Sequence, residues 1–110
     1  MNEVRHESYT ALHGDDTLAG EGSHVVAQSG SHVVAREGSY VEAWRGSDVE
    51  AEAGSHVTAR QGSYVIARDG SYVVAEPSSH VIARQGSYVE AQPGSDIIAR
   101  QGSYVVAVDG

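Results

Sequence analysis

The chain has no cysteine, no phenylalanine, two prolines and one tryptophan among its 110 residues. The lack of cysteine excludes disulfide bonds and thiolate metal sites. The lack of phenylalanine, with Leu12 and Leu18 as the only leucines, excludes an ordinary globular core of large side chains. No apolar run approaches the length of a signal peptide or membrane span. We therefore expect a soluble chain with a thin core, produced in the cytoplasm or associated with a virion.

Positive charge is also scarce. Seven basic residues stand against 15 Asp and Glu residues, which gives a formal net charge of −8 at pH 7. The acidic excess is concentrated in residues 1–21, where five acidic side chains accompany Arg5. Binding to nucleic acid requires a basic surface that neutralises phosphates. The composition therefore predicts no nucleic-acid partner.

An eight-residue unit begins at Gly22 and recurs eleven times to the last residues of the sequence. Glycine stands at position one, serine at two, valine or isoleucine at four and alanine at six. Only Ser78 replaces the leading glycine. Disordered low-complexity chains do not keep residue types at fixed positions over so many units, so the pattern predicts a repeat fold.

Side chains alternate between the two faces of a strand, so positions two, four and six share one face. Serine, valine and alanine on that face are small and uncharged, and we expect them to be buried. Positions three, five and seven carry most of the His, Tyr, Glu and Arg residues and must face water. A shift of one residue would bury Asp48, Glu50 and Arg68, which fixes the register. The leading glycine predicts a turn between strands.

Eight residues are too few to circle a core, whereas two units make a sixteen-residue coil. Residues 75–90 match residues 91–106 at eleven of sixteen positions, which supports this longer period. We therefore predict an all-β fold, a flattened parallel β-solenoid (β-helix) with two eight-residue strand units per sixteen-residue coil. At ~4.8 Å per coil, the rod is expected to be roughly 30 Å long.

Residues 1–21 lack the clean unit, but counting back in eights from Ala27 reaches two further alanines. Two degenerate units therefore precede the clean ones, with Tyr9 and Thr17 in place of the core valine. Solenoids need a polar terminal unit that covers the core. We expect an acidic N-terminal cap with two degenerate octads over residues 1–21 and an octad-repeat β-solenoid over residues 22–110. A loose acidic leader is the alternative.

The unit Gly-Ser-x-(Val/Ile)-x-Ala-x-x, clearest at 46–51 and 94–99, resembles the repeats of bacterial ice-nucleation proteins. Their sixteen-residue unit also divides into two Gly-Ser-x-x-x-Ala octads. The chain is also similar to octad-repeat proteins predicted in actinobacterial and phage genomes. The resemblance covers residues 22–109 and implies a β-solenoid with two strands per coil. Ice-nucleation repeats carry Thr-x-Thr at positions three and five, where the clean units of this sequence have only Thr58.

Outward residues sixteen apart are expected to stack in columns along the rod. One such column ends in three consecutive tyrosines, which are Tyr72, Tyr88 and Tyr104. Stacked aromatic rings can stiffen the C-terminal coils. Rigid tyrosines can equally form an interface with a partner or a second copy.

On the opposite face an Ile-Ala-Arg triplet recurs three times. It places isoleucines in one column, namely Ile66, Ile82 and Ile98, and arginines in the next, namely Arg68, Arg84 and Arg100. A solvated ladder is one interpretation. The other is an apolar and basic stripe that docks on an acidic surface, such as the N-terminal segment of another protomer. Nearer the N-terminus, Arg36 is expected to stack on Glu52.

The sequence shows no pattern typical of catalysis. The six histidines are spread along the chain, and none stands beside another histidine or a carboxylate pair with metal-ligand spacing. The repeated serines are expected to be structural hydroxyls inside the rod, and the outward pair Asp48 and Glu50 to be solvated. We therefore predict no enzyme activity, no metal, no cofactor, no membrane contact and no obvious cavity in so thin a rod.

These features favour a non-enzymatic structural or interaction module, a small rigid rod that self-associates or attaches to a larger assembly such as a phage virion or cell surface. The clean units run to the last residues, with Val105, Val106 and Val108 near an open strand edge. This edge predicts a tail-to-tail homo-oligomer through residues 94–110. An ice-binding or ice-nucleation-like surface is an alternative function, and an acidic mimic of nucleic acid is a less favoured one.

Overall fold

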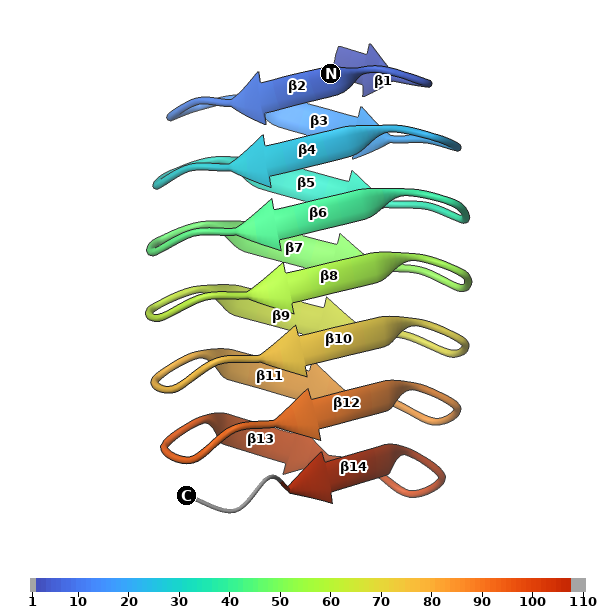
Figure 1. The fold of residues 1–110 in the computed structure, drawn as a ribbon, viewed down its shortest axis with the longest axis vertical. Helices are drawn as coiled ribbons and strands as arrows, with labels where there is room; N and C mark the ends of the chain where they lie inside the picture. Colours follow the sequence, from blue (N-terminus) through green and yellow to red (C-terminus); the bar gives the residue numbers. More distant parts are fainter. Residues whose placement is uncertain (1, 108–110) are drawn as a thin grey trace.

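The computed structural model describes residues 2–107 as a stack of short strands in two parallel sheets (Figure 1). The first sheet contains the odd-numbered strands β1 (Asn2–Val4), β3 (Asp16–Ala19), β5 (His32–Ala35), β7 (Asp48–Ala51), β9 (Tyr64–Ala67), β11 (His80–Ala83) and β13 (Asp96–Ala99). The second contains the even-numbered strands β2 (Ser8–Ala11), β4 (His24–Ala27), β6 (Tyr40–Ala43), β8 (His56–Ala59), β10 (Tyr72–Ala75), β12 (Tyr88–Ala91) and β14 (Tyr104–Ala107). This described part holds no helix long and apolar enough to cross a membrane.

Consecutive strands lie in opposite sheets, and each strand from β1 to β12 pairs with the strand two further along the chain. In β10 and β12, for example, Tyr72 lies opposite Tyr88 and Ala75 opposite Ala91, a spacing of sixteen residues. The predicted fold, an all-β parallel solenoid with two strands in each sixteen-residue coil, is therefore confirmed. Its longest dimension is 35 Å, close to the length that the coil spacing predicts.

The core is as thin as the sequence indicates. In the interior coils the valine at position four and the alanine at position six are almost completely buried, as at Val73 and Ala75, both 0% exposed. Burying one valine contributes about 1.5–3 kcal/mol, whereas ordering the backbone of one residue costs about 1–2 kcal/mol. A single coil therefore cannot be stable alone, and each coil depends on its neighbours.

The corners satisfy their own polar groups. The serine at position two points inward, and its hydroxyl donates to the backbone carbonyl three residues earlier, as from Ser71 Oγ to Arg68 O at 2.6 Å. The glycine at position one adopts a positive φ, for example 80° at Gly70, which an L-residue with a side chain rarely adopts. The structure thus gives both residues a local role in turning the chain.

The N-terminal strands differ from the clean coils. Tyr9 lies opposite Val25 and Thr17 opposite Val33, in the places that the sequence predicts for them. Strand β1 was not predicted, and Val4 pairs with Ala19 at a spacing of fifteen residues. The corner that follows β1 is one residue shorter than the others, and His6 takes the positive φ of 51° there.

Ser78 adopts a φ of 66°, the conformation that glycine has at the other clean corners. This conformation costs a residue with a Cβ about 1–2 kcal/mol, partly offset by the greater freedom of glycine in the unfolded chain. We expect Ser78→Gly to raise the free energy of unfolding by about 0.5–1 kcal/mol, measured by denaturant titration.

Gly94 provides the matched reverse change, because it follows Ser78 by one coil and has a φ of 84°. A Cβ built at Gly94 would meet its first neighbour, Pro77 Cβ, only at 3.8 Å, so space does not oppose a side chain. Gly94→Ser should lower the free energy of unfolding by a similar amount. An equal stability for Ser78→Gly and the wild-type chain would show that this corner is not strained.

Candidate functional site

The outer face of the second sheet carries a ladder of rings. Tyr40 stacks on His56 with ring centroids 4.9 Å apart, His56 meets Tyr72 at a tilt of 50°, and Tyr72 stacks on Tyr88 at 5.0 Å. Tyr104 follows in register opposite Tyr88, with 69% of its surface exposed. Of the three tyrosines singled out in the sequence, two thus lie within the ladder and the third stands at its open end.

Tyr72 is further held by a carboxylate of the next coil. Its hydroxyl donates to Glu90 Oε1 at 3.0 Å. This hydrogen bond, followed by partial burial and the negative charge of Glu90, raises the pKa of Tyr72 above its ordinary value of 10.0. The contact joins position three of one coil to position five of the next. It helps to hold the Tyr72 ring beside Tyr88, which lies on the same strand as Glu90.

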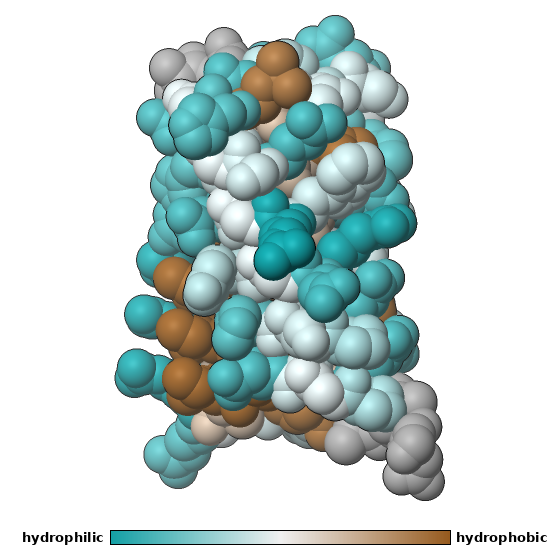
Figure 2. Space-filling view, turned by 90° about the vertical axis from the view of Figure 1, so that its left-hand side faces the viewer, coloured by the Kyte–Doolittle hydropathy of each residue, from teal (hydrophilic) through white to brown (hydrophobic). Residues whose placement is uncertain are grey.

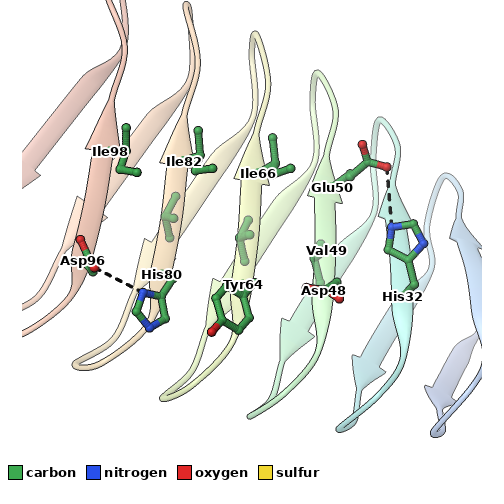
Figure 3. Close-up of a pocket in the computed structure, with 12 residues that line it drawn as sticks. His32, Asp48, Val49, Glu50, Tyr64, Ile66, His80, Ile82, Asp96 and Ile98 are labelled. Atoms are coloured by element: carbon green, nitrogen blue, oxygen red, sulfur yellow. Dashed lines mark ion pairs between the residues drawn. The ribbon is translucent and has the colours of Figure 1, made fainter.

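The isoleucine column on the first sheet is in register as predicted, with Ile66 opposite Ile82 and Ile82 opposite Ile98. Figure 3 shows the three side chains side by side in one row. The arginine column beside it is less uniform than expected, because Arg68 Nη2 donates to Glu50 Oε1 at 3.1 Å. Like-charge repulsion along that column is therefore reduced at its N-terminal end.

Closer to the N-terminus, Arg36 Nε lies 3.7 Å from Glu52 Oε1. The predicted pairing of these two side chains is confirmed. Both pairs are largely exposed, so their expected contribution to stability is small. They instead balance charge on the outer face of the first sheet.

The sequence predicted no cavity, yet a groove of about 620 Å³ runs along the outer face of the first sheet. One wall is the row at position three and the other is the row at position five, as Figure 3 shows. We call this feature the axial groove. Its lining residues are His32, Asp48, Val49, Glu50, Tyr64, Val65, Ile66, His80, Val81, Ile82, Asp96 and Ile98. The prediction failed because it considered only the interior of the rod, whereas the groove lies between rows of outward side chains.

Histidines of the groove contact carboxylates on neighbouring coils. His32 lies between Asp16, with Nδ1 and Oδ1 3.4 Å apart, and Glu50, with Nε2 and Oε2 3.7 Å apart. His80 Nδ1 is 3.4 Å from Asp96 Oδ2. Asp16 and Asp96 lie in register with His32 and His80, in keeping with the columns expected at a spacing of sixteen residues. The contact with Glu50 spans eighteen residues and did not follow from that spacing. Among residues 2–107 no group of three or more such side chains is arranged to hold a metal ion.

The last coil leaves its core open. Ile97 is only half-buried, Ala99 is exposed, and 38% of Val105 is exposed at the position where interior valines are almost completely covered. Val106 and Ile98, which point outward, are 45% and 58% exposed. We call these five residues the C-terminal edge. Val108, also predicted to belong to this surface, lies outside the described residues.

The two ends of the rod therefore differ. At the N-terminal end Val4 and Ala11 are buried, with exposures of 2% and 0%. Figure 2 shows hydrophobic surface, in brown, along one side of the lower half of the rod and at its lower end. That end is the one formed by β13 and β14 in Figure 1. On this face the apolar surface is thus continuous toward the C-terminal coils, whereas the brown areas nearer the top are separate patches.

The contact between Tyr72 and Glu90 has a consequence at alkaline pH. The folded state holds the phenolic proton more tightly than the unfolded chain, so the stabilisation is complete below pH 10 and is lost as pH rises through the folded pKa. Glu90→Gln should bring the pKa of Tyr72 closer to its ordinary value. Tyrosinate absorbance, taken as the difference between each chain and its Tyr72→Phe variant, measures this change.

Glu76→Gln is the control, because it removes a carboxylate from the same face without touching the contact between Tyr72 and Glu90. It should leave the titration of Tyr72 unchanged. Identical Tyr72 titrations in the wild-type and Glu90→Gln chains would contradict the assigned cause.

The fold and these surfaces can be set beside known proteins. No protein-family model, curated protein or solved structure matches the chain. The resemblance to ice-nucleation repeats and to octad-repeat proteins therefore stays an expectation drawn from the octad itself. What the chain does must be inferred from its own surfaces, of which the C-terminal edge and the axial groove are the two candidates.

Proposed function

We propose that the chain is a non-enzymatic structural module, a small rigid rod that self-associates through its C-terminal edge. Copies joined in this way would form part of a larger assembly, such as a phage virion or a cell surface, or would attach to one. The observation that carries the proposal is the open core of the last coil, where Val105 is 38% exposed and the equivalent Val89 is 0% exposed. Apolar surface uncovered at a strand edge favours pairing with another edge.

A second copy is the best-matched occupant. A two-fold axis perpendicular to the rod would place the last coils of two copies against each other, so that both sheets continue by antiparallel pairing. The half-buried Ile97, the exposed Ala99 and Val105 of each copy would then cover one another. Among the described strands β13 and β14 are the last of their sheets, and the backbone groups at their outer edges would gain partners at the same time.

The size of the contact predicts its strength. The rod measures 23 by 18 Å across, so its end covers roughly 400 Å², about half the area that each partner contributes to a standard stable interface. We therefore expect a weak dimer in the micromolar range or above. Weak end contacts suit an assembly in which many copies act together.

The alternative functions have less support. Positions three and five of the outward faces mix carboxylates, rings and aliphatic side chains, and Thr58 is their only threonine in the clean units. An ice-binding surface built on a regular hydroxyl array is therefore less favoured. Arg68, Arg84 and Arg100 on the first sheet disfavour a surface that mimics the charge of nucleic acid.

Val106→Lys tests self-association. Val106 is the outward residue of the terminal strand β14 and is 45% exposed. A lysine there would place like charges close together across the two-fold axis and protect the strand edge. Sedimentation velocity over rising micromolar concentrations should show a dimer for the wild-type chain and a monomer for Val106→Lys.

Val74→Lys is the matched control. Val74 holds the same octad position as Val106 in the same sheet, but it lies on the interior strand β10, which β12 separates from β14. It should leave the dimer intact. A wild-type chain that stays monomeric at several hundred micromolar, or a dimer that Val106→Lys does not weaken, would rule out this use of the C-terminal edge.

A further inference from the structure

We propose that the axial groove is a binding site for a linear organic dication, a flexible apolar chain with an ammonium group at each end. The groove lies on the outer face of the first sheet and shares only Ile98 with the C-terminal edge, so this inference does not rest on self-association through that edge. Its volume of about 620 Å³ is within the range of about 300–1,000 Å³ that small-molecule sites occupy. The proposed function does not depend on this binding site.

The shape of the groove favours an elongated ligand. Its walls run along the rod, across strands β5 to β13, and consist of side chains from successive coils. Ile66, Ile82 and Ile98 form one wall, and Tyr64, stacked on His80 with ring centroids 4.9 Å apart, forms the centre of the other. A chain of methylene groups lying between these walls would contact apolar atoms on both sides.

The repeat of the walls further favours a plain chain over a peptide. Wall residues recur at ~4.8 Å, the spacing of the coils, whereas an extended peptide advances ~3.3 Å per residue. Side chains of a bound peptide would therefore fall out of step with the pockets between wall residues. A polymethylene chain has no side chains and meets no such conflict.

Charge complementarity selects the end groups. The groove carries carboxylates toward both ends, with Asp48 and Glu50 on β7 and Asp96 on β13. Asp48 and Asp96 are three coils apart, about 14 Å. Within residues 2–107 Asp48 forms no ion pair, and the one such contact of Asp96 is with His80 at 3.4 Å. Two ammonium groups at that separation would each meet a carboxylate.

The arginines of this face do not occupy the groove. Arg68 is engaged by Glu50 at 3.1 Å. Arg84 and Arg100 follow Ile82 and Ile98 by two residues and are absent from the groove lining, so they lie beyond the isoleucine wall. The carboxylates are therefore nearer to a ligand in the groove than these guanidinium groups are, and the net charge of −8 adds a general attraction for cations.

Decamethylenediamine is the probe, since it combines a ten-carbon chain with an ammonium group at each end. The probe is titrated into the nitrogen-15-labelled full chain, and the chemical shifts of the backbone amides are followed by NMR. The dissociation constant should be on the order of 0.1–1 mM. The largest shifts are expected at Tyr64, Ile66 and Ile82. Tetramethylenediamine, which is too short, and decanediol, which is uncharged, should each bind at least about threefold more weakly.

Two carboxylate variants locate the charges. Asp48→Asn and Asp96→Asn should each raise the dissociation constant about threefold, as expected for partly exposed charge pairs. Asp69→Asn is the matched control, because Asp69 is an exposed corner residue outside the groove, and it should have no effect beyond a slight general weakening. Ile82→Gln should weaken binding, whereas Val74→Gln on the opposite sheet should not.

Several results would overturn the proposal. Equal weakening by Asp48→Asn, Asp96→Asn and Asp69→Asn would show that the probe is attracted only by the overall negative charge. Equal binding of decanediol and decamethylenediamine would remove the role of the carboxylates. Shifts spread over both sheets, rather than over β7 to β13, would place the probe elsewhere.

Discussion

The whole structure depends on the backbone hydrogen bonds that join each coil to the next and hold equivalent residues, sixteen apart, in register. The ladders continue through the corners as well as the strands, as where Gly70 N donates to Gly86 O at 3.0 Å. Each coil buries only two valines and two alanines as apolar side chains, too little to order its sixteen residues on its own. Stability therefore belongs to the stack, and any position where the stack stops is a weak point.

The same register converts a local pattern into continuous surfaces. Because equivalent positions lie about 4.8 Å apart, a residue type that recurs every sixteen residues becomes a row, and two rows with a gap between them become a groove. The ring ladder of the second sheet and the axial groove of the first both arise in this way. Among residues 2–107 the ladders end at the last coil, where core side chains such as Val105 reach the surface.

Most of the fold could be predicted from the sequence because every octad repeats the same pattern of turn residues and of buried and exposed positions. The alternation of small and large side chains gives the buried set, and the sixteen-residue match over 75–106 gives the coil. Strand β1 could not be predicted, because His6 stands at the corner where the clean units have glycine, and the spacing changes to fifteen residues. The ladder positions of Tyr72 and Tyr88 follow from the register alone.

Diagonal contacts were beyond prediction for a different reason. Arg68 reaches Glu50, and Tyr72 reaches Glu90, across eighteen residues, and such contacts depend on the direction in which each side chain leans. The contact of His32 with Glu50 depends on the same detail, whereas Asp16 lies opposite His32 in register. Register determines which residues are neighbours in a column, whereas rotamers determine which neighbouring columns touch.

Because each coil consists of two octads, the rod can change its length and keep its two faces only in steps of a whole coil. Inserting sixteen residues would add one coil of about 4.8 Å and keep every downstream row on its own face. Inserting eight would transfer every downstream residue to the opposite sheet, so that the isoleucine row would lie beside the ring ladder instead of on its own face. Growth by whole coils, as the similarity of 75–90 to 91–106 indicates, therefore lengthens the protein while preserving both of its faces.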